Sequence, residues 1–139
     1  MSKVVALDVG TVRTGIAESD PMGMMAFPLE TVPTEDVLQF LDGYLARERS
    51  ETVVVGQPKR LHGEEAPLED FILGLIEKIK RRFPAVSVVR IDERFTSSLA
   101  ARALVDSGTK KSKRREKGSV DRVAAAIILQ SYLDAQRPF

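Results

Sequence analysis

Three acidic residues stand at the ends of predicted elements, where their side chains could meet. Asp8 lies near the end of the apolar run Lys3–Val9, Glu93 follows another apolar run, and Asp121 begins the apolar face of a predicted helix. Carboxylates bind hard divalent cations and exchange protons, so these residues are candidates for a metal-dependent or acid–base site.

A cluster of the three carboxylates would require a positive partner. Two such charges about 4 Å apart repel by ~4 kcal/mol at an effective dielectric constant near 20. Protons or a divalent ion must therefore occupy the site. Because the chain has no cysteine and one histidine, oxygen ligands favour Mg²⁺ or Mn²⁺ over zinc.

A strongly basic segment lies just before Asp121. Residues 110–118 hold six basic side chains and one acidic side chain, whereas the rest of the chain has 15 basic and 19 acidic residues. A positive segment on an acidic body is typical of a surface that binds a polyanion, although it can also be a solvated loop. Together with the carboxylates, it points to phosphodiester chemistry.

The hydropathy pattern predicts an α/β fold with one mixed sheet and helices on both faces. Five strands are predicted, the first three forming an antiparallel meander: Lys3–Val9, Gly15–Ser19, Ala26–Thr31, Thr52–Val55 and Val86–Ile91. Four helices are predicted at Glu35–Arg49, with Thr34 as N-cap, and at Leu68–Phe83, Thr96–Val105 and Val120–Ala135. Gly56 and Pro58 are expected to end the fourth strand.

Strand and helix periodicity indicate where the acids point. Alternation places Asp8 on the same side as Ala6, and Glu93 on the same side as Ile91. Asp121 is expected in the first turn of the last helix, on the stripe that packs against the sheet. Ligands of open α/β sheets gather at the carboxyl ends of strands, so we expect the three side chains to converge there.

Each acid also has a simpler explanation. Asp8 could accept hydrogen bonds from the turn at residues 10–14, and Glu93 could pair with Arg90 or Arg94. Asp121 could interact only with the positive end of its helix, which is worth ~0.3–1 kcal/mol.

Size and composition exclude several classes of protein. A chain of 139 residues with 43% hydrophobic residues and a net charge of +1 predicts one compact domain over residues 1–139. The absence of cysteine excludes disulfide scaffolds and thiol catalysis. The longest apolar run, Val123–Leu129, is seven residues, and the first residues contain no export signal. We therefore expect a cytoplasmic protein with no membrane partner.

Four motifs resemble those of the YqgF family, whose members are described as Holliday junction resolvases and as pre-16S ribosomal RNA nucleases. The motifs occur in order along nearly the whole chain: DVGTVRTG, VVVGQP, IDERFTS and KRREKGSVDRVAAAIILQSYL. The resemblance implies an RNase H-like fold with a five-stranded mixed sheet, three strands antiparallel and two parallel, flanked by helices.

The resemblance also implies a site and a reaction. Asp8, Glu93 and Asp121 would be the catalytic and metal-binding residues, with Asp92 as the alternative in the third motif. They would hold two Mg²⁺ or Mn²⁺ ions, the second weakly, and hydrolysis would leave 5′-phosphate and 3′-hydroxyl ends. The implied substrate-binding residues are all basic: Arg13, Lys110, Lys111, Lys113, Arg114, Arg115 and Lys117.

The implied substrate is nucleic acid, either an rRNA precursor, as on ribosomal particles, or branched DNA in recombination. Maturation of the 5′ end of pre-16S rRNA is favoured, and a monomer or weak homodimer is expected. Relatives commonly have a further acid at the position of Ala124, so a nonenzymatic RNA-binding ribosome-assembly factor remains an alternative. An actin-like nucleotide-binding domain is a second alternative, because DVGTVRTG also resembles the phosphate loop of those proteins.

Overall fold

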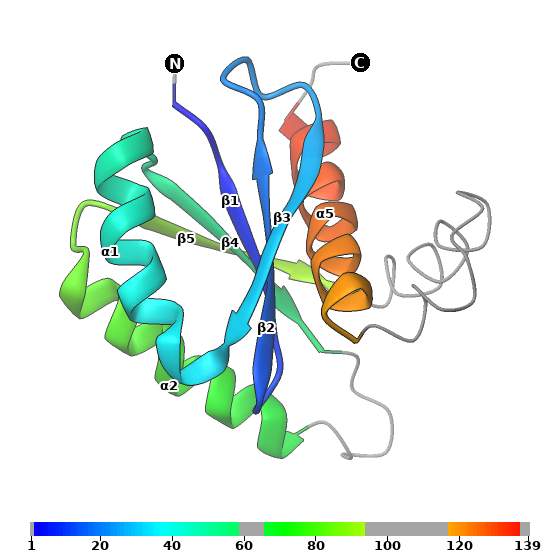
Figure 1. Ribbon diagram of the computed structural model, residues 1–139. Coiled ribbons are helices and arrows are strands. Elements are labelled where there is room, and N and C mark those ends of the chain that lie inside the picture. Colours follow the sequence, from blue (N-terminus) through cyan, green and yellow to red (C-terminus); the bar gives the residue numbers. More distant parts are fainter. Residues whose placement is uncertain (1, 59–65, 94–116, 137–139) are drawn as a thin grey trace.

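The computed structural model describes residues 2–58, 66–93 and 117–136 (Figure 1). Its five-stranded sheet has the order β3-β2-β1-β4-β5. The first three strands are antiparallel neighbours, and β4 and β5 continue the sheet parallel to β1. The strands are β1 (Val5–Val9), β2 (Arg13–Ser19), β3 (Ala26–Pro33), β4 (Thr52–Gln57) and β5 (Ser87–Asp92). The predicted mixed sheet is confirmed.

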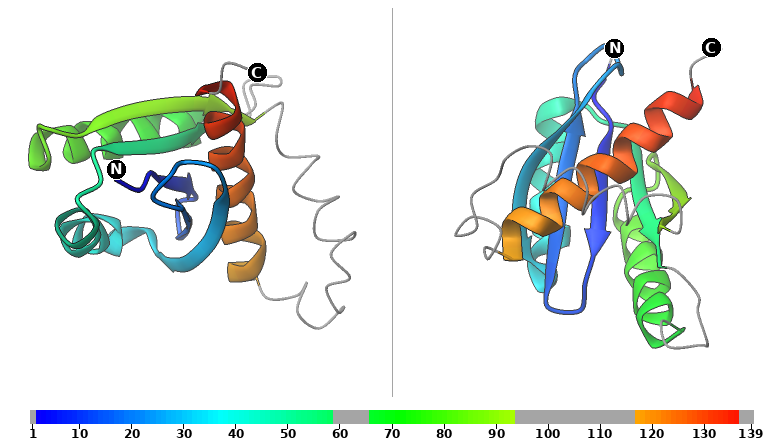
Figure 2. Two further views of the ribbon diagram at one scale, coloured as in Figure 1. Left: turned by 90° about the horizontal axis from the view of Figure 1, so that it is seen from above. Right: turned by 90° about the vertical axis from the view of Figure 1, so that its right-hand side faces the viewer.

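Helices cover both faces of the sheet (Figure 2). The short 3₁₀ helix η1 (Thr34–Asp36) leads into α1 (Val37–Glu48), which packs with α2 (Ala66–Arg82) on one face. Helix α5 (Lys117–Gln136) packs on the other face, mainly against β1, β2 and β3. The helix predicted at Thr96–Val105 lies outside the described residues. Among the described residues, no helix has the length and apolarity needed to cross a membrane.

Alternation along β1 divides the apolar core into two layers. Val5, Leu7 and Val9 are buried under α1 and α2, whereas Ala6 is buried under α5. Small residues on the second face let α5 lie close to the sheet. Asp8 is two residues after Ala6, so its side chain lies on the same face of the sheet, as predicted. This is the face that α5 covers.

Three local predictions were wrong. Thr34 does not cap a helix through its side chain; it is buried, its hydroxyl donates to the Gly10 carbonyl at 2.6 Å, and it lies 2.9 Å from the Thr14 hydroxyl. Gly56 lies inside β4 because the pairing with β5 continues through Gly56 and Gln57. Asp121 lies in the second turn of α5, since this helix begins at Lys117.

Candidate active site

The side chains of Asp8 and Glu93 are hydrogen-bonded to each other at one edge of the sheet. Asp8 is near the carboxyl end of β1, and Glu93 directly follows β5, so β4 lies between the two strands. A Cβ at Gly56 of β4 would lie 3.1 Å from Cδ of Glu93 and 2.8 Å from Cδ1 of Ile128. The missing side chain of Gly56 therefore leaves room for Glu93 beneath α5.

Burial strongly affects the protonation of this pair. The pKa of Glu93 is raised to about 8. The main cause is loss of solvent on burial, and smaller contributions come from the negative charge of Asp8 and from the hydrogen bond between Glu93 and Asp8. Burial is also the main cause that raises the pKa of Asp8; its hydrogen bond to Glu93 opposes this shift, and the charge of Asp121 adds to it. Near neutral pH, Glu93 therefore holds a proton and donates it to the Asp8 carboxylate.

Asp121 reaches the same edge from α5, but its carboxylate accepts a hydrogen bond from Nε of Arg13. The backbone of Asp121 lies directly over Gly15 of β2, where any Cβ would collide with the Asp121 carbonyl oxygen. The close packing of α5 on β2 thus fixes the position of Asp121. Its charge still acts on Asp8, so the third predicted acid lies within electrostatic range of the pair.

A cavity of about 250 Å³ opens beside Asp8 and Asp121. Asp8, Arg13 and Asp121 line it together with the turn at residues 9–12. The turn is closed by the Gly10 amide, which donates to the Arg13 carbonyl at 3.0 Å. The structure thus places Arg13, which the resemblance names as a substrate-binding residue, beside Asp8 and Asp121. Of the predicted basic residues, Lys110, Lys111, Lys113, Arg114 and Arg115 lie outside the described residues, and only the backbone of Lys117 is described.

The donor set suits a hard divalent cation in part. Two half-buried carboxyl groups that share a proton can exchange that proton for a cation, and oxygen donors of this type match Mg²⁺ or Mn²⁺. However, within residues 2–58, 66–93 and 117–136, no three His, Cys, Asp or Glu residues are grouped closely enough to hold a metal. Asp121 is paired with Arg13. The oxygens of Asp8 and Glu93 suit such an ion, whereas Oδ2 of Asp121 is engaged by Arg13.

The sequence did not predict the ion pair between Arg90 and Glu69. Arg90 donates to both carboxylate oxygens of Glu69 in α2, at 2.7 and 3.0 Å, and to the carbonyl oxygens of Val55 and Gly56. Glu69 is only 2% exposed. Arg90 therefore joins α2 to the end of β4 and lowers the pKa of Glu93 only through its charge. Glu69 could not be identified from the sequence, because one acidic residue on the apolar face of α2 does not alter the hydrophobic periodicity of the helix.

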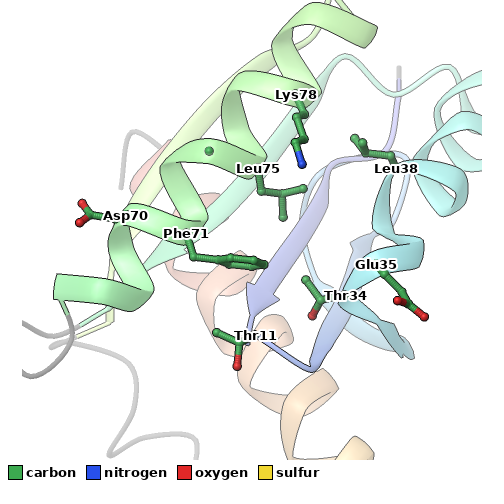
Figure 3. A pocket seen from close by; sticks show the side chains of 9 residues that line it. Thr11, Thr34, Glu35, Leu38, Asp70, Phe71, Leu75 and Lys78 are labelled. Atoms are coloured by element: carbon green, nitrogen blue, oxygen red, sulfur yellow. The ribbon is translucent and has the colours of Figure 1, made fainter.

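A larger cavity of about 490 Å³ lies between α1 and α2 (Figure 3). Its walls include Leu38, Phe71 and Leu75, with Lys78 further along α2. Thr11 in the β1–β2 turn borders both this cavity and the one at the acids. Neither Asp8 nor Asp121 lines the larger cavity, so the acid chemistry belongs to the smaller one.

The fold is that of the RNase H-like resolvases. Solved structures with this fold include Thermus thermophilus RuvC in complex with a Holliday junction substrate, with a TM-score of 0.59, 21% identity and coverage of 98% of this chain and 97% of that one. A fowlpox virus resolvase in complex with Holliday junction DNA matches with a TM-score of 0.56 and 14% identity, covering 96% and 97% of the two chains.

The family follows from sequence comparison. The model of the RuvX family, described as Holliday junction resolvase, matches residues 2–135, and the chain belongs to this family. A relative from Bacteroides thetaiotaomicron is 44% identical over 137 residues, which are 99% of each chain, and one from Porphyromonas gingivalis is 43% identical over 134 residues, 96% of this chain and 97% of that one. Both are named provisionally as pre-16S rRNA nucleases. The predictions of family, fold and nuclease class are confirmed.

Proposed function

We propose that this chain is a metal-dependent nuclease that hydrolyses phosphodiester bonds in the maturation of the 5′ end of pre-16S rRNA. The full-length similarity to relatives with that name supports the substrate. Nucleic acid is the partner that such a nuclease requires, and ribosomal particles in the cytoplasm are where this precursor is found.

The observation that carries the proposal is the contact between Asp8 and Glu93. Two half-buried carboxyl groups in contact cost stability, because one of them must hold a proton: the charge of Asp8 and their hydrogen bond raise the pKa of Glu93. A purely structural sheet edge would favour apolar residues or separate partners. Their placement at the carboxyl ends of β1 and β5 is the usual position of a ligand in an open α/β sheet.

The roles of the residues follow from their positions. Bound Mg²⁺ or Mn²⁺ would activate water and stabilise the leaving 3′ oxygen. Asp8 and Glu93 would hold the ion by giving up their shared proton, and Asp121 would complete the set from α5. Arg13 would bind a phosphate of the strand, and the basic residues before α5 would bind the flanking backbone. Cleavage in which the 3′ oxygen leaves would give a 5′-phosphate and a 3′-hydroxyl.

The test is cleavage of pre-16S rRNA by the purified protein with Mg²⁺ or Mn²⁺. We expect Asp8→Asn to lower cleavage by at least ~100-fold while RNA binding persists, because the substitution removes a ligand and not a phosphate contact. Asp134→Asn, an exposed change at the far end of α5, is the matched control and should cleave normally. Equal cleavage by Asp8→Asn and the parent protein would refute the site.

A second candidate function is a nonenzymatic RNA-binding factor for ribosome assembly. The pairing of Asp121 with Arg13 favours it, because this pairing leaves two of the three acids together. The apolar residue at position 124 also leaves the site without the further acid of its relatives. RNA binding without cleavage under any divalent ion would support this alternative.

A branched DNA substrate is tested beside the RNA. Holliday junction resolution needs two symmetric cuts and therefore two copies of the chain. If junction DNA is cut and pre-16S rRNA is not, and the protein is a dimer by mass, the substrate in this proposal is wrong although the chemistry holds.

A further inference from the structure

Arg13 and Asp121 form an ion pair in the cavity at the acids. Arg13 is the first residue of β2, Asp121 is in the second turn of α5, and the Nε–Oδ2 contact joins them. The Arg13 side chain is 39% exposed and that of Asp121 is 20% exposed. The pair is therefore open to solvent, and a ligand in the cavity meets both partners.

The backbones on both sides of the pair are held in place, so the exposed Arg13 side chain is the part that can move. The Arg13 carbonyl accepts from the Gly10 amide at 3.0 Å, and the Val12 carbonyl accepts from the Thr34 amide at 2.9 Å. On the other side, the Asp121 backbone is packed against Gly15. The long Arg13 side chain ends in exposed, rotatable groups, whereas the short Asp121 side chain sits on a fixed helix.

Each partner has a competing ligand in the proposed reaction. The guanidinium group binds carboxylates and phosphates with the same planar geometry. The Asp121 carboxylate can neutralise either a guanidinium or a divalent cation. The pair is partly exposed, and fully exposed ion pairs are worth a factor of only about 1.5 to 5 in an equilibrium, so a phosphate and a metal ion together can replace the pair.

We propose that Arg13 is a replaceable counter-ion of Asp121. In the protein without substrate, Arg13 neutralises Asp121 and weakens metal binding; when a nucleic-acid phosphate binds, the guanidinium moves to it and Asp121 becomes a metal ligand. This inference rests on the proposed nuclease function and deepens it, because it couples metal binding to substrate binding. By thermodynamic reciprocity, the metal strengthens phosphate binding by the same factor.

The test is a double-mutant cycle with the parent protein, Arg13→Ala, Asp121→Asn and the double variant, each checked for folding by circular dichroism. Mn²⁺ affinity is measured without nucleic acid by electron paramagnetic resonance. We expect Arg13→Ala to bind Mn²⁺ about 2- to 5-fold more tightly than the parent, and to have no such effect in the Asp121→Asn background.

A second measurement uses a single-stranded RNA oligonucleotide in EDTA. We expect Asp121→Asn to bind it more tightly, because Arg13 is released, and this gain should disappear when Arg13 is also replaced. Arg122→Ala removes the same charge from the next position in α5 and is the control for general electrostatics. It should not reproduce the Mn²⁺ effect.

The outcomes separate the two proposals. If none of the four proteins binds Mn²⁺ but the parent protein cleaves RNA when Mn²⁺ is added, only the counter-ion role is overturned; if the parent protein also fails to cleave, the proposed metal-dependent function is overturned with it. If Mn²⁺ binds but Arg13→Ala leaves its affinity unchanged, or Arg122→Ala raises it equally, only the counter-ion role is overturned. An effect of Arg13→Ala that persists in the Asp121→Asn background also overturns the counter-ion role alone.

Discussion

The carboxyl groups of Asp8 and Glu93 hydrogen-bond to each other across Gly56, which lies in the strand between theirs. This relationship joins three of the four motifs in one place. It also makes the site depend on a residue that has no functional group, and this dependence can be tested directly.

Replacement of Gly56 by alanine should damage both stability and activity. The new Cβ would lie 2.8 Å from Cδ1 of Ile128 and 3.1 Å from Cδ of Glu93, so the Ile128 side chain must move and Glu93 is displaced from its place beside Asp8. We expect a loss of ~1–3 kcal/mol in the free energy of unfolding, measured by urea denaturation, and a loss of cleavage. Gly43→Ala in α1 is the matched control: open space surrounds that position, and alanine should stabilise the helix by ~0.5–1 kcal/mol. A neutral Gly56→Ala would contradict the packing described here.

Without metal, stability should depend on pH through Glu93. The pKa of Glu93 is about 8 in the folded protein, whereas its ordinary value, expected in the unfolded chain, is 4.5. Between pH 4.5 and pH 8 the folded state therefore binds more protons than the unfolded state. Stability is therefore greatest below pH 4.5 as far as this group is concerned, and falls as pH rises toward 8. We expect Glu93→Gln to flatten this part of the pH profile in thermal unfolding. Glu77→Gln, an exposed change in α2, should keep the slope of the parent protein.

The buried pair of Arg90 and Glu69 should contribute much more to stability than the exposed pair of Arg82 and Asp42. Glu69→Gln leaves Arg90 without its carboxylate partner in a buried setting, and we expect a loss of ~3 kcal/mol. Asp42→Asn breaks a pair whose side chains are 52% and 39% exposed, and should cost less than ~1 kcal/mol. Chemical denaturation of both variants checks the order, and equal losses would contradict it.

The basic residues before α5 make a graded prediction for RNA binding. If Lys113, Arg114 and Arg115 contact phosphates, each alanine substitution should reduce the slope of log K against log[salt] by ~0.7–0.9. Binding measured at several salt concentrations gives the slope. An unchanged slope in the triple variant would show that this segment does not bind the backbone.

Periodicity alone placed Asp8 on the side of Ala6 and Glu93 on the side of Ile91, because side chains alternate along a strand; the structure shows that both Ala6 and Ile91 face α5. Sequence could not predict the contact between Arg13 and Asp121, since it depends on how closely α5 packs on β2 at Gly15. The same limit applies to Arg90 and Glu69, which meet only through the packing of α2 on the sheet.

The wrong predictions have local causes. Threonine is a common helix cap, but in the folded protein the Thr34 hydroxyl donates to the Gly10 carbonyl and hydrogen-bonds with the Thr14 hydroxyl. Gly56 was expected to end a strand because of its low strand propensity, yet its pairing with Ile91 carries β4 onward. In both cases a tertiary contact overrides a local preference.

The metal site itself is tested most sharply by an anomalous-scattering map from crystals of this protein soaked in Mn²⁺. We expect a peak within about 2.0–2.4 Å of carboxylate oxygens of both Asp8 and Glu93, as is usual for hard divalent ions. A protein that cleaves RNA with Mn²⁺ while its crystals show the ion bound elsewhere, with the Asp8–Glu93 hydrogen bond intact, would contradict this assignment.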